Sequence, residues 1–183
     1  MTSNEISQEN MEQHENKKAV AWLTLGHGMA DSYSGFINPI LPFIVANIGT
    51  TLAAATCALS ASQLFSSMMQ AVFGFIADKW RKRFFIFWGI ILASIFFSLT
   101  GLVQNIWQLA LCLILGGVGV GFYHPQATGF VVRYSGKNLA KYMSIFIAAG
   151  TIGYSVGPII SSSITQFFGV TKLPLAASWG ILF

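Results

Sequence analysis

Charged residues are scarce in this sequence. They make up only 9% of its 183 residues, against roughly a quarter in soluble domains, while 54% of the residues are hydrophobic and the mean hydropathy is +0.64. These values exclude an ordinary soluble domain and indicate a membrane protein. The formal net charge of +4 does not predict a nucleic-acid-binding surface, because the basic residues lie in short gaps between apolar runs.

Residue sets typical of enzymes, metal sites and disulfide-rich proteins are also missing. The two cysteines, Cys57 and Cys112, both lie in apolar segments, which argues against a disulfide framework. The three histidines lack the spacing of a zinc site, and neither a phosphate-binding glycine loop nor a nucleophile–base set is present. The sequence therefore predicts no enzyme activity, no cofactor and no metal site.

Long apolar segments dominate the chain. Five are complete, and each reaches the roughly 20 residues that a helix needs to cross a bilayer: they are predicted at 18–45, 51–77, 84–103, 106–132 and 139–168. A sixth, at 173–183, is too short to cross, so we expect the sequence to be a fragment of a longer chain. Because lipid offers the backbone no water, the prediction is an all-α membrane bundle, preceded by a disordered cytoplasmic tail over residues 1–17.

Lysine and arginine lie almost entirely on one side of this predicted bundle. Of the ten basic residues, only Lys172 falls on the opposite side. Because cytoplasmic loops carry the excess of Lys and Arg, we expect a multi-pass protein of the cell membrane with its amino terminus in the cytoplasm.

A single acidic residue, Asp31, lies inside the apolar segments. A carboxylate in hydrocarbon costs roughly 3 kcal/mol, so it normally faces a wet cavity or a partner. His27 and Asn38 share its helix face, and His124 of the fourth segment is predicted at a similar depth, at about 1.5 Å per residue. Two imidazoles and a carboxylate at neighbouring depths favour a proton relay or substrate site. The alternative is that His27 only hydrogen-bonds Asp31 or a backbone carbonyl.

The second segment carries its own polar stripe. Ser60, Gln63, Ser67 and Gln70 follow one another at helical spacing. Such side chains either line a cavity or hydrogen-bond neighbouring helices, and the sequence leaves both interpretations open.

Glycines cluster in the fourth and fifth segments. Gly117 and Gly121, and again Gly153 and Gly157, are four residues apart, a spacing that lets helix backbones approach closely. Pro158 removes a backbone hydrogen bond beside the second pair. We expect these positions to form packing surfaces, with a hinge at Pro158 as the alternative.

The loop after the second segment resembles the signature loop of the major facilitator superfamily of transporters, Gly-x-x-x-Asp-(Arg/Lys)-x-Gly-(Arg/Lys)-(Arg/Lys). The matching residues are Gly74, Asp78, Lys79, Lys82 and Arg83, while Arg81 stands at the second glycine. The stretches 26–42, with His27 and Asp31, and 121–125, ending in His124-Pro125, are similar to the fosmidomycin-resistance group of exporters within that superfamily.

The resemblance implies the amino-terminal six-helix half of a transporter with two pseudo-symmetric halves. Substrate would bind near the membrane midplane while the halves rock, and the signature loop would latch one state. The expected partners are the lipid bilayer, a small molecule, protons and a carboxy-terminal six-helix half. Gln126 stands where the exporter group commonly has an acid, and Gly129 lies where an arginine often follows.

The resulting hypothesis is proton-coupled export of a small organic molecule. Asp31 would exchange the proton, His27 and His124 would assist it, and Gln126 is a further candidate at the site. The alternatives are an importer or uniporter in which Asp31 only binds substrate, and a non-transporting membrane scaffold that pairs with itself.

Overall fold

The chain folds entirely into helices over the part that the structure describes. A computed structural model describes residues 15–80 and 84–182, except for the side chains of residues 77, 78 and 80. The predicted tail thus lies outside the described residues apart from its last three. No strand occurs in the described ranges, so the all-α prediction is confirmed. The α-helices are α2 (Lys17–Phe36), α3 (Leu41–Ile48), α4 (Leu52–Trp80), α5 (Phe84–Leu99), α6 (Ile106–Tyr134), α7 (Leu139–Phe168) and α8 (Ala177–Ile181).

Local sequence sets several helix ends. The Asn16 side chain accepts a hydrogen bond from the Ala19 amide at 3.0 Å and caps α2. Asn105 does the same for α6 through the Gln108 amide, also at 3.0 Å. Gly49, at φ 67°, ends α3 in the left-handed conformation that glycine adopts without strain.

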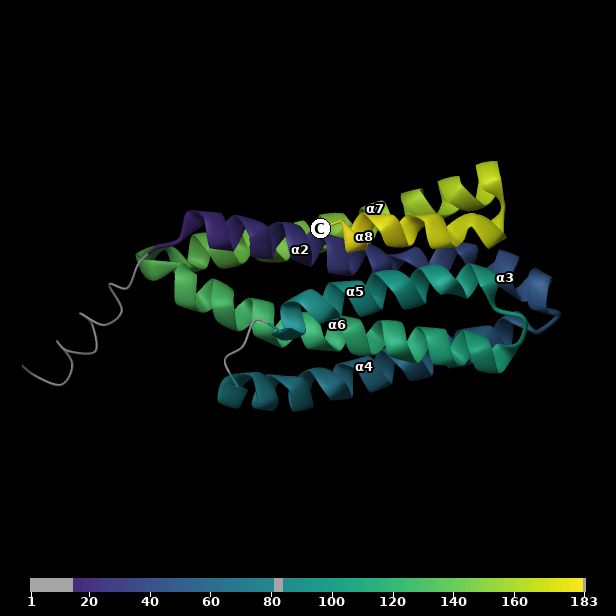
Figure 1. Cartoon of the computed structure of the whole chain (residues 1–183), viewed down its shortest axis with the longest axis horizontal. Coiled ribbons are helices and arrows are strands. Elements are labelled where there is room, and N and C mark those ends of the chain that lie inside the picture. The colour runs from purple at the N-terminus through teal and green to yellow at the C-terminus, as the bar shows by residue number, and fades with distance from the viewer. Residues whose placement is uncertain (1–14, 81–83, 183) are drawn as a thin grey trace, which may run out of the picture.

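The first apolar segment is broken near its outer end, as its two prolines predict. Asn38–Ile40 form a 3-10 turn between α2 and α3, with Pro39 inside it and Pro42 in the first turn of α3. Proline lacks an N–H and fits the start of a helix better than its interior. The chain therefore continues in nearly the same direction through α3 (Figure 1).

Four helical spans among the described residues are long and apolar enough to cross a membrane, namely Leu52–Ile76, Phe84–Leu102, Ile106–Tyr134 and Gly136–Phe168. α2 is not among them because histidine, aspartate and serine interrupt its apolar sequence. Its polar residues lie in the bundle, where α2 packs along α7 and also contacts α5 and α6.

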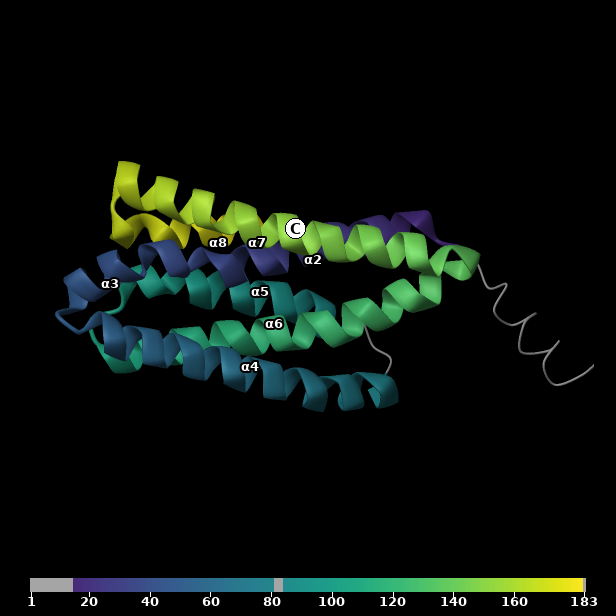
Figure 2. The same cartoon turned by 180° about the vertical axis from the view of Figure 1, so that it is seen from behind.

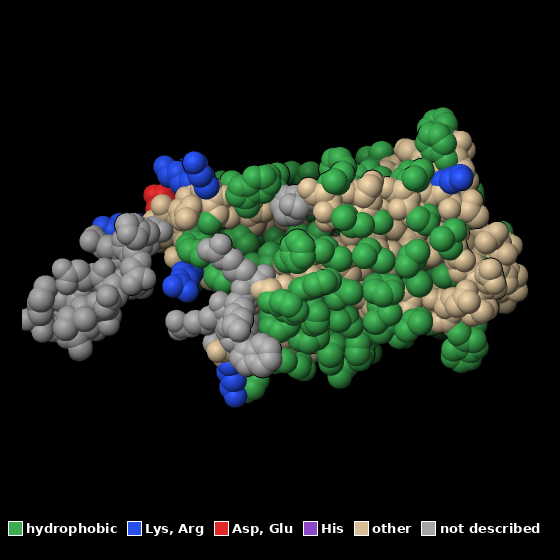
Figure 3. Space-filling view, viewed as in Figure 1, with side chains coloured by type: hydrophobic (Ala, Val, Ile, Leu, Met, Phe, Trp, Pro, Cys, Tyr) green, Lys and Arg blue, Asp and Glu red, His purple; other side chains and the backbone are tan. Residues whose placement is uncertain are grey.

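The long helices form one elongated bundle with α6 in its interior. α6 packs against α4 on one side, α5 on another and α2 on a third, and Figures 1 and 2 show α4 and α7 at opposite sides of the bundle. Lys and Arg side chains gather at the end where α2 begins, and a single one lies at the far end of the face shown in Figure 3. Hydrophobic side chains cover most of the surface between them.

The last segment turns back along the bundle. After α7, Gly169 at φ 86° redirects the chain, and the 3-10 segment Val170–Ala176 and α8 run back beside α5. The Tyr33 hydroxyl donates to the Ala176 carbonyl at 2.7 Å, which fixes this segment to α2.

Candidate functional site: a His–Asp–His cluster beside a polar pocket

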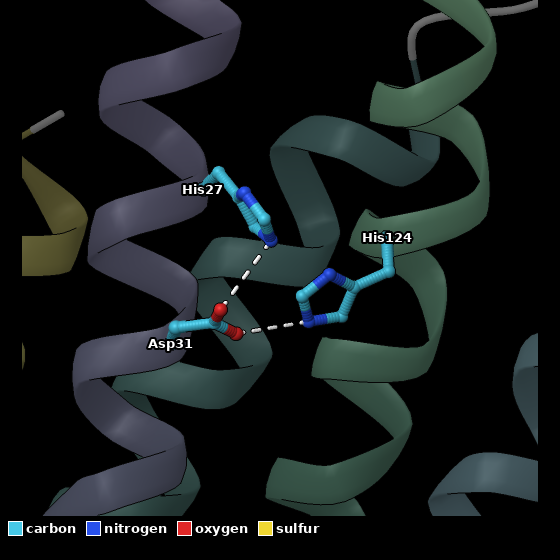
Figure 4. A group of neighbouring side chains, drawn as sticks. All are labelled: His27, Asp31 and His124. Atoms are coloured by element: carbon cyan, nitrogen blue, oxygen red, sulfur yellow. Dashed lines mark ion pairs between the residues drawn. The ribbon is translucent and has the colours of Figure 1, made fainter. Parts of the chain in front are cut away.

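Three ionisable side chains from two helices meet inside the bundle. Asp31 of α2 lies between the two imidazoles: its Oδ2 is 3.3 Å from Nε2 of His27, and its Oδ1 is 3.0 Å from Nε2 of His124 on α6 (Figure 4). We call these three residues the His–Asp–His cluster. Sequence reasoning placed the two histidines at one depth, and the structure brings both to the same carboxylate.

The orientation of His27 is fixed by a third helix. Its Nδ1 lies 2.7 Å from the carbonyl oxygen of Phe146 on α7, and its ring stacks on the Phe146 ring with centroids 4.0 Å apart. A carbonyl oxygen can only accept a hydrogen bond, so Nδ1 carries a hydrogen and donates it. In a neutral His27, Nε2 then carries no hydrogen, and its lone pair faces Asp31.

This orientation determines how many protons the cluster needs. A neutral His124 can donate its Nε2 hydrogen to Asp31 Oδ1, but the contact between His27 Nε2 and Asp31 Oδ2 then pairs two acceptors. One added proton, on either atom, turns that contact into a hydrogen bond. The observed geometry therefore suits a cluster that carries one proton more than two neutral histidines and a carboxylate.

The cluster is enclosed but not sealed. The side chain of His27 is 11% exposed, while those of Asp31 and His124 are 19% and 20% exposed. Gly150 of α7 makes the space, because a methyl group there would collide with Asp31 and His27. One nitrogen or oxygen atom from each of the three side chains lies within 4.8 Å of the other two, so a single small cation, such as a metal ion, could contact all three residues. The sequence alone does not predict a metal site here.

A polar pocket adjoins the cluster along the bundle. It has a volume of about 210 Å³ and is lined from α2, α4, α5, α6 and α7 by residues that include Ser34, Ser66, Gln63, Gln70 and Tyr154. Ser34 lies three residues beyond Asp31 and therefore on the same helix face. Of the α4 stripe predicted from sequence, Gln63, Ser67 and Gln70 line the pocket and Ser60 does not.

The structure separates two other candidates from the cluster. Asn38 is exposed and donates to the Tyr154 hydroxyl at 3.3 Å, at the outer end of the pocket wall. Gln126 is buried against α5, where its Oε1 accepts the Ile86 amide hydrogen at 3.0 Å. Its carbonyl thus satisfies one of the amides that every helix leaves unpaired at its start.

Comparison with known proteins identifies the family. A sequence profile of the Major Facilitator Superfamily matches residues 23–183. The chain belongs to this superfamily. The superfamily consists of multi-pass membrane transporters, in agreement with the helical bundle and its apolar surface.

Curated relatives within the superfamily include both resistance proteins and a sialic acid transporter. The chain is 26% identical over 80% of its length to the fosmidomycin resistance protein of Escherichia coli, and 28% identical over 81% to the quinolone resistance protein NorA of Staphylococcus aureus. It is 30% identical over 70% of its length to the sialic acid transporter NanX of Escherichia coli. The chain spans 36%, 38% and 31% of these relatives, respectively.

The superfamily's signature loop is described only in part. Gly74 faces Pro125 of α6 across the α4–α6 contact, and the Lys79 ammonium lies 4.4 Å from the centre of the Phe75 ring. The Asp78 side chain and the whole of Lys82 and Arg83 lie outside the described residues, so the latch stays a prediction.

The glycines predicted to pack do lie at helix contacts. On α7, a methyl group at Gly153 would collide with the Gly28 carbonyl of α2, and one at Gly157 with the Ser32 carbonyl. The corresponding pair on α6, Gly117 and Gly121, faces Ser66 of α4 less tightly. α7 passes through Pro158 without ending.

Sequence reasoning missed residues that hold the cluster through backbone or buried contacts. Phe146 contributes its carbonyl and ring to His27, and Tyr123 lies beside the same imidazole while its hydroxyl donates to the Leu23 carbonyl. Ser62 and Ser66 of the pocket were missed because they lie beside the polar stripe rather than in it. The sequence feature that could have pointed to α7 as a neighbour of the cluster is Gly150, whose lack of a side chain leaves room for His27.

Proposed function

We propose that this chain forms one wall of a secondary transporter that exports a small organic molecule in exchange for protons. The observation that carries the proposal is the contact between His27 Nε2 and Asp31 Oδ2 at 3.3 Å. Because the Phe146 carbonyl holds the other ring nitrogen as a donor, this contact needs an additional proton. A proton-binding carboxylate within a membrane bundle is a residue that proton-driven transporters use.

The cluster connects proton binding to helix position. It joins α2 to α6 through His124 and to α7 through the Phe146 carbonyl. Loss of the shared proton leaves two acceptors facing each other, which weakens this three-helix contact. We infer that the protonated cluster stabilises the arrangement seen here and that its deprotonation favours the other access state. The signature loop after α4 would latch one of the two states.

The opposite wall of the pathway is proposed to be a second six-helix unit. In α4 and in α7, only 22% of the apolar stretch that could cross the membrane is buried within the bundle, against 50% in α5 and 44% in α6. α4 and α7 thus expose broad faces on either side of α2 and α6. In transporters of this type, substrate binds between two such halves. The basic end of the bundle is proposed to lie in the cytoplasm.

Two relatives favour export, since their names describe fosmidomycin and quinolone resistance. A second candidate, uptake of a small molecule, is favoured by the sialic acid transporter among the relatives. Export moves substrate into everted membrane vesicles, whereas uptake moves it into intact cells. Measuring both with a quinolone, fosmidomycin and sialic acid separates the two directions.

The carboxylate test uses the same vesicles with an imposed pH gradient. Asp31→Asn keeps the size of the side chain but cannot exchange a proton, so we expect gradient-driven accumulation to be lost while substrate exchange at equal pH persists. Asp31→Glu restores the acid and should recover part of the accumulation. Ser60→Ala, which lies on α4 outside the pocket, is the control. Unchanged gradient-driven accumulation in Asp31→Asn would remove Asp31 from the mechanism.

A further inference from the structure

The serines of the polar pocket point their hydrogens away from it. Each hydroxyl donates to a backbone carbonyl: Ser62 to Leu59 at 2.7 Å, Ser66 to Gly117 at 2.7 Å, Ser67 to Gln63 at 3.0 Å and Ser34 to Ala30 at 3.4 Å. A hydroxyl has one hydrogen and two lone pairs. With the hydrogen used, each serine can offer the pocket only an acceptor.

The remaining polar groups of the pocket can act as donors or acceptors. Gln63 and Gln70 can both donate and accept, and Tyr154, which already accepts from Asn38, can donate its own hydrogen. Among the residues that the structure describes, no Lys, Arg or His lines the pocket. The nearest acidic residue along α2 is Asp31, one turn from Ser34 on the same face, and its two oxygens face the two histidines.

The pocket also has an apolar side. Leu59, Phe97 and Val120 line it, and its volume of about 210 Å³ exceeds the roughly 150 Å³ in which a protein cavity can hold benzene. An occupant can therefore combine an aromatic or branched aliphatic body with a small polar group.

We propose that the pocket binds a hydrogen-bond donor, namely the primary or secondary ammonium group of an amphipathic amine, and binds it more tightly than an oxyanion on a body of the same size. A carboxylate or phosphonate carries only acceptors on its charged group and would leave the serine oxygens unpaired. Sites built around a particular hydrogen bond discriminate strongly against analogues that cannot make it. This inference rests on the proposed function, because it takes the pocket to be the substrate site of the transporter.

Three probes with the same phenylethyl body separate charge from hydrogen bonding. They are 2-phenylethylammonium, its N,N,N-trimethyl derivative, which keeps the charge but has no donor, and 3-phenylpropionate, an oxyanion. Binding to the whole protein in lipid nanodiscs is measured by calorimetry. Hydrogen bonds to a charged group correspond to about ten- to hundred-fold in affinity, so the primary ammonium should bind at least about ten-fold tighter than the trimethyl cation, and the carboxylate weakest.

Variants tie the preference to the pocket. Ser67→Ala and Ser34→Ala each remove an acceptor from the pocket. The carbonyls to which these serines donate belong to helix backbones and keep their helical hydrogen bonds. Each variant should therefore reduce the difference in affinity between the primary and the trimethylated cation. Ser60→Ala is the matched control and should leave it unchanged. Equal affinities of the two cations, a carboxylate that binds as tightly as either, or no binding of the primary ammonium would each overturn the proposal.

The outcome is independent of proton coupling. Asp31→Asn, at a residue outside the pocket lining, should preserve the preference for the primary ammonium, because the serines remain. If proton-driven flux survives Asp31→Asn while the preference persists, the proposed coupling fails and the pocket assignment stands. If the preference for the primary ammonium is absent while Asp31→Asn abolishes proton-driven flux, the pocket assignment fails and the proposed coupling stands.

Discussion

The ring of His27 is held by the backbone of Phe146, 119 residues away in the sequence: Nδ1 lies 2.7 Å from the carbonyl oxygen. This bond crosses from α2 to α7 and decides which nitrogen of His27 faces Asp31. A helix carbonyl provides it, so the side chain at position 146 can change without removing the acceptor.

His27→Phe tests this relationship. Phenylalanine can keep the ring stack on Phe146 but has no donor for the buried carbonyl and no acceptor for Asp31. We expect a loss of about 1–3 kcal/mol in unfolding free energy and loss of gradient-driven transport. Phe146→Leu is the control, since it removes the stack and keeps the carbonyl, and it should retain coupling. Equal coupling in His27→Phe and the wild type would contradict the role given to this bond.

Gly153 and Gly157 should tolerate no side chain. In each case a methyl group would meet a carbonyl of α2, and backbone atoms cannot move aside as a flexible side chain can. Overpacking typically costs about 1–3 kcal/mol. Gly153→Ala and Gly157→Ala should therefore lower the midpoint of thermal unfolding and reduce the fraction of protein that elutes as a single symmetric peak in gel filtration. Gly129→Ala, with open space around it, should be neutral or stabilising. Similar melting of all three variants would rule out the close α2–α7 contact.

Gln126 should act in the fold rather than in proton transfer. Gln126→Leu leaves the Ile86 amide, in the first turn of α5, without this acceptor, and we expect a cost of about 1–3 kcal/mol in thermal unfolding. Gln126→Glu keeps an acceptor for this amide, but burial at this position opposes the favourable interaction of a negative charge with the helix start. A leucine variant that melts like the wild type would show that this hydrogen bond contributes little.

Glu15 should give the basic end of the bundle a dependence on acid pH. The hydrogen bond from the Tyr142 hydroxyl, followed by the charge of Lys17, holds the pKa of Glu15 below its usual 4.5. A depressed folded-state pKa stabilises the fold above the ordinary pKa, and this contribution is lost as the pH falls through the lowered value. Glu15→Gln should therefore lower the thermal midpoint at neutral pH and cease to matter well below pH 4.5.

The control for that experiment is Tyr142→Phe, which removes the donor and should reproduce the effect of Glu15→Gln at neutral pH without adding to it. A difference between wild type and Glu15→Gln that is the same at every pH would exclude the carboxylate as its source.

The sequence predicts those parts of the molecule that follow from period and composition. The helical class follows from composition and the break near Pro39 from the missing N–H of proline. The glycine contacts of α7 and the shared depth of His27 and His124 follow from residue spacing along each helix. The Phe146 carbonyl and the direction of the serine hydroxyls could not be predicted. They depend on how α2, α4, α6 and α7 are rotated against one another, and a backbone carbonyl has no signature in the residue type. The partner of Gln126 could not be predicted for the same reason, since its helix face turns towards α5.

The central claim is that Asp31 and His27 share an exchangeable proton, and infrared difference spectroscopy between low and high pH tests it most directly. The protein in lipid should show a carboxyl band that shifts in heavy water and changes as the pH is raised. This band should vanish in Asp31→Asn and return, displaced, in Asp31→Glu, because no other acidic residue lies within the apolar segments. Difference spectra that are identical in wild type and Asp31→Asn would contradict the account.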